Sequence, residues 1–204
     1  MGDSIFDNAA YVGWLAPDVI RQVRQRLPHG WKATLEAVDG SMVEDVRGQL
    51  RRLPADATHL IVSAGGNDAL NSSDILYAPV RSTAEALAGL ADIADEFERR
   101  YHRMLTEVLA HELRTTICTV YYPRFPDAAL QRIAVTGLTV FNDCIIRAAF
   151  AHGIPLLDLR FICTEEGDYA NPIEPSAQGG AKIAEAIVRL LVHGFAGGRT
   201  EVFT

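Results

Sequence analysis

Cysteine is scarce in this sequence and follows no pattern. The 204 residues contain three cysteines, Cys118, Cys144 and Cys163, and no two of them have the spacing of a metal-binding or redox pair. Cys118 lies within an apolar run, which is typical of a small buried thiol. An odd number of unpatterned cysteines fits a reducing compartment, and the sequence implies no metal ion or other cofactor.

Basic runs and long apolar runs are also missing. The formal net charge is −7, and no stripe of lysine and arginine indicates a nucleic-acid partner. The beginning of the sequence has no basic region followed by an apolar stretch, so no secretory signal is expected as written. We expect no membrane span, because no apolar run is long enough, and we take the cytoplasm as the default localisation.

The sequence does contain short apolar runs, bounded by turn residues, at intervals along its length. Such runs are typical of strands that helices cover on both faces. The predicted strands are Ala33–Val38, His59–Ala64, Thr115–Tyr121 and Ile154–Leu159. The length favours a single domain over residues 1–204.

Helical signals occupy the intervals between those runs. Pro17 precedes a first helix, and Ser41 and Ser82 each stand three residues before a glutamate, which is the spacing of a capping box. The expected helices are Asp18–Leu27, Ser41–Leu53, Ser82–Leu113, Ala128–Ala151 with a break near Gly137, and Ser176–His193. Strands that alternate with helices predict a flavodoxin-like, three-layer α/β/α fold around a parallel sheet.

Three turn motifs bring polar groups to the expected ends of strands. The tripeptide Gly2–Ser4 opens the sequence, the pair Asp39–Gly40 follows the first apolar run, and Gly65–Asp68 follows the second. Ligands bind at the carboxyl ends of parallel strands. A serine hydroxyl, a backbone amide beside a glycine and an asparagine amide that converge there can attack a carbonyl and hold the oxyanion. Taken alone, the Gly2–Ser4 tripeptide is more typical of a simple turn, and each of the other two motifs is also consistent with one.

In their order and their positions, these motifs resemble those of the SGNH (GDSL-like) hydrolases. The resemblance covers most of the chain and implies a nucleophile at Ser4 and oxyanion-hole donors at Gly40 and Asn67. Members of that family are esterases, lipases, thioesterases and carbohydrate deacetylases. A small-molecule ester or acyl compound is therefore the implied substrate, while the sequence does not indicate an oligomeric state.

The resemblance also implies a central strand ahead of the Gly2–Ser4 turn, where this sequence has only Met1. Either a strand lies upstream of the printed start, or another segment fills the position. The tail Thr200–Phe203 is the candidate for such a segment. We expect a chain with this position open to be poorly stable or prone to aggregation, because unpaired strand edges promote association.

The fourth motif of the family is replaced. SGNH hydrolases carry Asp-x-x-His before the last helix, and the matching stretch here is Asn171-Pro172-Ile173-Glu174. Asn171 thus stands in place of the orienting acid, and Glu174 stands in place of the general base. Glu174 is either a base with a raised pKa, held by Asn171, or a cap of the last helix with a depressed pKa.

We therefore predict hydrolysis of ester or related acyl bonds through Ser4, with Gly40 and Asn67 as the oxyanion hole and Glu174 as an atypical base. We expect none of the six histidines to reach Ser4. The alternative is a non-catalytic acyl- or carbohydrate-binding module that has the pocket without the relay.

Overall fold

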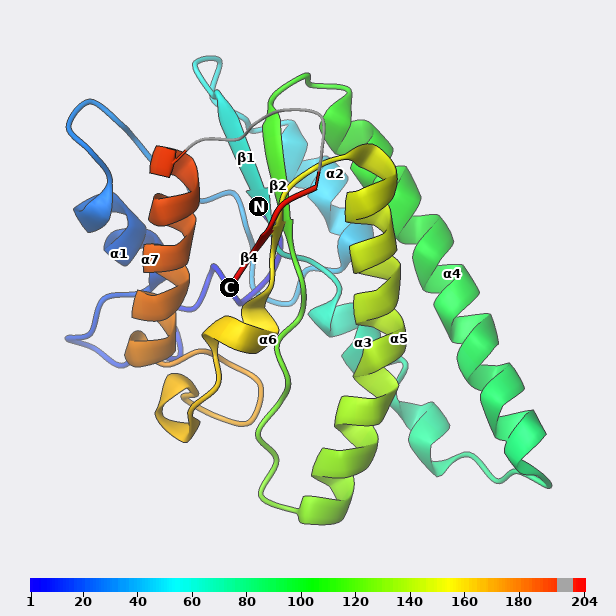
Figure 1. Ribbon diagram of the computed structural model, residues 1–204. Helices are drawn as coiled ribbons and strands as arrows, with labels where there is room; N and C mark the ends of the chain where they lie inside the picture. The colour runs from blue at the N-terminus through cyan, green and yellow to red at the C-terminus, as the bar shows by residue number, and fades with distance from the viewer. Residues whose placement is uncertain (194–199) are drawn as a thin grey trace.

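A parallel sheet between two layers of helices forms the body of the molecule. The computed structural model describes residues 1–193 and 200–204 (Figure 1). Within them the sheet has the strand order β1-β2-β3-β4, and every neighbouring pair is parallel. The strands are β1 (His59–Val62), β2 (Arg114–Cys118), β3 (Leu156–Leu157) and β4 (Val202–Phe203). The predicted α/β class with a parallel sheet is confirmed.

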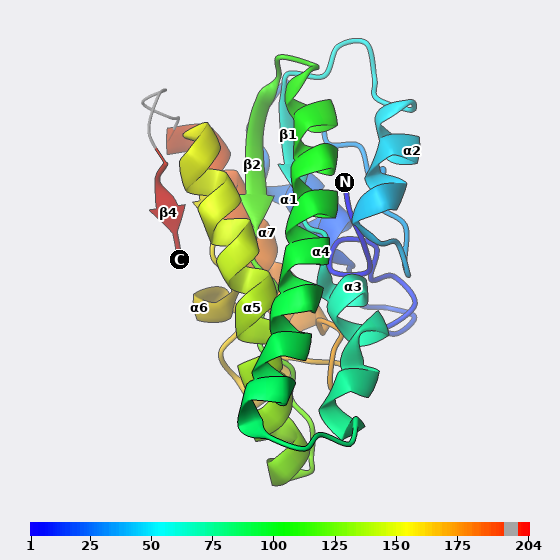
Figure 2. The ribbon, with the colours of Figure 1, turned by 90° about the vertical axis from the view of Figure 1, so that its right-hand side faces the viewer.

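Helices cover both faces of this sheet, as two views at right angles show (Figures 1 and 2). One layer contains α1 (Val19–Arg26), α6 (Leu159–Ile162) and α7 (Ala177–His193). The other contains α2 (Val46–Leu50), α4 (Thr83–Leu109) and α5 (Ala128–His152). Short elements at the strand ends are η1 (Val43–Asp45), α3 (Gly66–Asn71), η2 (Ser73–Tyr77) and η3 (Glu166–Asp168).

The alternation of side chains along the strands divides the core into two clusters. Ile117 and Leu156 belong to the cluster under α2, α4 and α5. Their neighbours in sequence, Cys118 and Leu157, belong to the cluster under α1, α6 and α7. Successive strand residues point to opposite faces, so a strand covered on both sides is apolar throughout.

Most predicted helices are present, with changes at their ends. Ser82 caps α4 through its side chain, as the capping-box spacing predicted, and Asp18, expected as the first helical residue, is the N-cap of α1. Ser41 does not cap a helix; its hydroxyl accepts a hydrogen bond from Gln49 Nε2, and the helical segment begins only at Val43. The expected break near Gly137 is wrong, because α5 runs without interruption.

Two predictions about strands are wrong. The segment Ala33–Val38 forms no strand, because only Val38 among its described residues has a backbone partner there, the Gly2 carbonyl that accepts from its N–H. The tail does not fill the expected central-strand position, since β4 pairs with β3 at the far edge of the sheet. The short β3 and the start of α6 at Leu159 also shorten the last predicted strand.

Helix α5 is long and apolar enough to cross a membrane by the criteria of length and composition. It is weak evidence for a span, because core helices have the same properties. In this fold α5 packs against α4 and β2, and its Ile145, Ala148 and Ala149 are buried in the core.

Candidate active site

Ser4 follows a short strand-like stub that pairs with the end of β1. Gly2 bridges Ser63 in parallel, the Ser63 N–H donates to the Met1 carbonyl, and the Asp3 N–H donates to the Ser63 carbonyl. Gly2 has a φ of +121°, and a Cβ there would lie 1.6 Å from the Ser63 carbonyl oxygen. Only glycine fits so close an approach, so this backbone contact fixes where the chain turns and where Ser4 lies.

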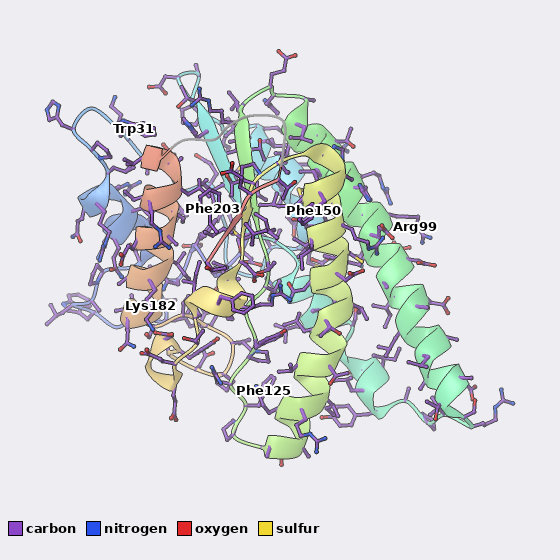
Figure 3. All side chains as sticks on the ribbon, viewed as in Figure 1. Trp31, Arg99, Phe125, Phe150, Lys182 and Phe203 are labelled. Carbon is purple, nitrogen blue, oxygen red and sulfur yellow. The ribbon has the colours of Figure 1, made fainter. Side chains whose placement is uncertain are left out.

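A cavity of about 300 Å³ opens beside Ser4 at the carboxyl edge of the sheet. Ser4, Asn67 and Glu174 are among its polar residues. Its walls are mainly apolar side chains from α3, η2, α4, α5 and the loop before α5, including Leu70, Ile75, Leu90, Phe125, Leu138 and Phe141. Figure 3 shows Phe125 in that loop, beyond the carboxyl end of β2. The sequence carries no signal for these walls, because only the packing of separate elements brings their residues together.

Ser4 and Glu174 are in direct contact although 170 residues separate them in the sequence. The Ser4 hydroxyl donates a hydrogen bond of 3.0 Å to Glu174 Oε1, and both side chains are buried. Burial raises the pKa of Glu174 to about 7; the Ser4 hydrogen bond opposes this rise, and the negative charge of Asp39 adds to it. Glu174 Oε2 is buried and accepts no hydrogen bond from the described residues.

The neighbouring turn shows how Glu174 is held. Asn171 Oδ1 accepts hydrogen bonds of 3.0 Å from the backbone N–H groups of Ile173 and Glu174, so Asn171 fixes the backbone and not the carboxylate. The Ser176 hydroxyl accepts hydrogen bonds from the Gln178 and Gly179 N–H groups at the start of α7. Ser176 therefore occupies the capping position, and the raised pKa of Glu174 is opposite to that of a helix cap.

Asn67 and Asp68 connect the second strand end to the turn that contains Gly40. Asn67 Nδ2 donates a 2.9 Å hydrogen bond to the Ser41 carbonyl, and Asp68 Oδ2 accepts one from the Val43 N–H. A side-chain amide has two N–H groups, so Asn67 retains a second donor while it lines the cavity. Gly40 has a φ of +80° and does not line the cavity. It is linked to the site only through its neighbour Ser41, which binds Asn67.

Asp3 is a second buried carboxyl group in the cavity wall. Burial raises its pKa to about 7, and the negative charge of Glu174 adds to the rise. Asp3 Oδ1 accepts a hydrogen bond from the Ile5 N–H, which holds the turn after Gly2. Asp68 pairs with Arg100 and Asp168 with Lys182, and neither contributes to the raised pKa of Glu174.

Other candidate chemistry is not found at the site. None of the five histidine side chains that the structure describes lines the cavity, and the side chain of His193 lies outside the described residues. Among those same residues, no group of three or more histidine, cysteine and acidic side chains is placed to hold a metal ion. The polar chemistry of the cavity is therefore a hydroxyl, two carboxyl groups and an amide.

The fold and the cavity together define an α/β protein with a serine–carboxylate pair at the carboxyl edge of its sheet. A family model described as the GDSL-like lipase/acylhydrolase family matches residues 1–182. The chain belongs to this family, whose membership supports hydrolase activity on esters. No curated protein sequence matches the chain.

Solved structures with the same fold include several esterases. A member of the lipolytic G-D-S-L family from Veillonella parvula is 13% identical, with a TM-score of 0.66 and coverage of 95% of this chain and 96% of that one. The aryl esterase of M. smegmatis is 14% identical, with a TM-score of 0.64 and coverage of 95% and 96%. Est24, a carbohydrate acetylesterase from Sinorhizobium meliloti, is 12% identical, with a TM-score of 0.64 and coverage of 96% and 97%. At these identities the likeness shows the fold.

Proposed function

We propose that this protein hydrolyses carboxylic esters through Ser4, with Glu174 as the general base in place of a histidine. The observation that carries the proposal is the 3.0 Å hydrogen bond from the Ser4 hydroxyl to Glu174 Oε1 inside the cavity. A base acts within hydrogen-bond reach of the proton it removes, and it works best when its pKa is near the working pH. The pKa of Glu174, raised to about 7 by burial, meets the second condition.

The reaction takes place in two halves. Ser4 Oγ attacks the carbonyl carbon while its proton passes to Glu174, and the protonated Glu174 then gives that proton to the departing alkoxide. Water, deprotonated by Glu174, attacks the resulting acyl-serine, and Ser4 regains a proton as the carboxylic acid leaves. Glu174 must be ionised at the beginning of each half, so the rate rises with pH through its pKa.

The second N–H of the Asn67 side chain is the donor we assign to the oxyanion. Its first N–H binds the Ser41 carbonyl, which fixes the plane of the amide before any substrate arrives. A donor held in place costs no reorganisation when the charge develops. The backbone N–H of Gly40 remains a predicted second donor, since this turn is attached to Asn67 through Ser41.

The apolar cavity favours an ester with an apolar acyl chain. Side chains from η2, α4 and α5 form one apolar side of it, among them Ile75, Leu76, Leu90 and Phe141. Burial of an apolar chain contributes roughly 0.8 kcal/mol per methylene group. We place the acyl chain in this cavity and the alcohol part of the ester toward the open side, near Ser4.

The test is hydrolysis of a short-chain aryl ester by four proteins: wild type, Ser4→Ala, Glu174→Gln and Glu166→Gln. We expect Ser4→Ala and Glu174→Gln each to lower kcat at least about a thousandfold, which is the scale of loss when a serine hydrolase loses a relay member. The exposed Glu166 lies in the same loop region and is the matched control for a lost carboxylate. If Ser4→Ala leaves the turnover unchanged, the non-catalytic binding module becomes the better description.

A further inference from the structure

Three polar side chains lie near Ser4 but outside the apolar cavity. Asp7 ends the turn that contains Ser4, Tyr11 lies in the loop that follows, and Asp39 stands in the turn at Gly40. The loop with Tyr11, dark blue in Figure 1, lies at the carboxyl end of the strands. Asp7 and Tyr11 are half-buried, Asp39 is exposed, and none of the three lines the cavity. These groups are therefore open to solvent at the end of the sheet where the cavity lies.

Two hydrogen bonds join these side chains into one group. The Asp39 N–H donates to Asp7 Oδ2 over 3.0 Å, and the Tyr11 hydroxyl donates to Asp39 Oδ2 over 2.7 Å. Neither bond uses the second oxygen of either carboxylate. We call Asp7, Tyr11 and Asp39 the acidic rim.

The acidic rim lies close enough to Glu174 for their charges to interact. Burial raises the pKa of Glu174, and the negative charge of Asp39 adds to the rise. The hydrogen bond to Asp39 raises the pKa of Tyr11 to about 12, and the charges of Glu174 and Asp7 add to it. Interactions between exposed charges fade over about 10 Å in ordinary buffers, so the acidic rim is a near neighbour of the Ser4–Glu174 pair.

No cationic side chain balances these acids. The ion pairs formed within residues 1–193 and 200–204 include neither Asp7, Asp39 nor Glu174. In the same part of the chain, the titratable groups that interact with the charge of Glu174 are all acids: Asp3, Tyr11, Asp39 and Tyr121. Carboxylates without a cationic partner produce a negative potential, which attracts a positively charged ligand.

Glu174 Oε2 is an independent indication of a ligand at this place. Only 6% of Glu174 is exposed, its side chain lines the cavity, and Oε2 accepts no hydrogen bond from the described residues. A buried acceptor without a partner is unfavourable, which favours a bound group that carries a donor or a positive charge.

The order of the proposed reaction places the alcohol part of the ester at this carboxylate. Glu174 gives its proton to the departing alkoxide, so the alcohol oxygen lies within hydrogen-bond reach of Glu174 during the reaction. The acyl chain occupies the apolar cavity, and the remaining atoms of the alcohol extend away from it. They therefore extend from Glu174 toward the acidic rim.

We propose that the acidic rim binds a positively charged alcohol part, and that the preferred substrates are esters of amino alcohols with an apolar acyl chain. This assignment rests on the proposed function, because it needs Glu174 beside the departing oxygen. The carboxylates of Asp7 and Asp39 attract the ammonium group, and Tyr11 adds an aromatic ring, which also attracts cations. A neutral hydroxylated alcohol gains hydrogen bonds from the same carboxylates and no attraction between charges.

The experiment compares butyrylcholine with the neutral ester in which a carbon atom replaces the choline nitrogen. The ratio of the two kcat/KM values is measured at pH 8 and low ionic strength in wild type, Asp39→Asn, Asp7→Asn and Asp92→Asn. We expect wild type to prefer butyrylcholine about tenfold, and Asp39→Asn and Asp7→Asn each to reduce that preference about threefold. Each asparagine retains an oxygen for the hydrogen bond that the aspartate accepts. Asp92, an exposed carboxylate of α4, is the matched control, and Asp92→Asn should retain the wild-type ratio.

Two further readouts separate the effect of charge from that of shape. An ionic strength of about 1 M should remove most of the preference, because exposed charges are then screened. A cation beside Glu174 favours its ionised form, so the pH midpoint of kcat should be lower with butyrylcholine than with the neutral ester. A merely structural role of the acidic rim would change neither quantity.

The outcomes distinguish this assignment from the proposed function. Equal kcat/KM values for the two esters in wild type, with hydrolysis that Ser4→Ala abolishes, would overturn the amino-alcohol assignment and leave the esterase in place. Glycerol monobutyrate hydrolysed faster than butyrylcholine would assign the acidic rim to hydroxylated alcohols and overturn it as well. Turnover that does not depend on Ser4 would overturn both proposals.

Discussion

The two hollows of this molecule lie at opposite ends of the same sheet and differ in how far the groups around them are paired by hydrogen bonds. At the carboxyl end, polar groups inside a small cavity are paired and positioned: Ser4 with Glu174, and Asn67 with Ser41. At the amino end, a groove more than twice as large runs beside an edge of β1 that the described residues leave mostly unpaired. The Gly2 stub joins the two, since it ends the groove and begins the turn to Ser4.

After Ser4 and Glu174, the largest expected effect on kcat comes from Asn67→Ala, which separates a catalytic role of Asn67 from a structural one. Asn67→Ala removes the proposed oxyanion donor, and we expect kcat to fall about 10²–10³-fold, as for the loss of one oxyanion-hole donor in other hydrolases. The lost hydrogen bond to Ser41 should lower the free energy of unfolding by only about 1 kcal/mol. Ester hydrolysis and urea denaturation measure the two effects separately.

Asn71→Ala, at the end of the same short helix, is the control for Asn67. Its side chain is exposed, so activity and stability should both stay near those of the wild type. If Asn67→Ala reduces stability strongly and activity only in proportion to the folded fraction, Asn67 is a structural clamp and the oxyanion donor lies elsewhere.

The two hollows should respond to pH with opposite signs. In the cavity, the pKa of Glu174 is raised from 4.5 to about 7, so its ionisation destabilises the fold as pH rises through that window. In the groove, the pKa of the Met1 amine is lowered from 8.0 to about 6, so protonation is the destabilising event and stability increases from pH 6 to 8. Burial lowers the pKa of this amine, and the negative charges of Asp3 and Glu36 oppose that change by favouring the protonated form.

Glu174→Gln should therefore stabilise the fold above pH 7 by about 1–3 kcal/mol and leave it unchanged below pH 4.5. The glutamine keeps an acceptor for the Ser4 hydroxyl and removes the charge whose burial is unfavourable. Urea denaturation at pH 4.5 and pH 8 measures this difference, with Glu166→Gln as the control. Destabilisation by Glu174→Gln at pH 8 would contradict the raised pKa.

Features of the site that depend on local turn chemistry could be predicted from the sequence. Turn motifs placed Ser4 and Asn67 at strand ends, and both line the cavity. The two interpretations of Glu174 could not be separated from the sequence, because the choice depends on where its carboxylate points. In the structure, the Glu174 carboxylate contacts Ser4, and Ser176 caps the last helix instead. Whether Glu174 acts as the base remains a prediction.

The errors lie where a segment depends on a distant partner. The run Ala33–Val38 has the composition of a strand, but a strand needs backbone partners along its length, and only Val38 finds one in the Gly2 stub. The tail pairs with β3 instead of filling the groove. Glycine weakens helices, so the sequence predicts a break near Gly137, yet tertiary packing keeps α5 continuous.

Gly137 gives the smallest expected effect and the sharpest test of what the cavity holds. It lines the cavity from α5, and a Cβ at this position would lie 3.6 Å from Leu76 Cδ2, which is ordinary contact. Gly137→Ala should fit and stabilise the helix by about 0.5–1 kcal/mol.

Gly137→Leu should extend into the cavity and reduce its depth. We expect kcat/KM for an aryl hexanoate to fall about tenfold with this variant while that for the acetate changes less than about twofold, because only the longer chain reaches the space between η2 and α5. Equal losses on both esters would show that the acyl chain takes another path. A loss confined to the hexanoate, beside unchanged values for Gly137→Ala, would assign chain-length selection to this wall of the cavity.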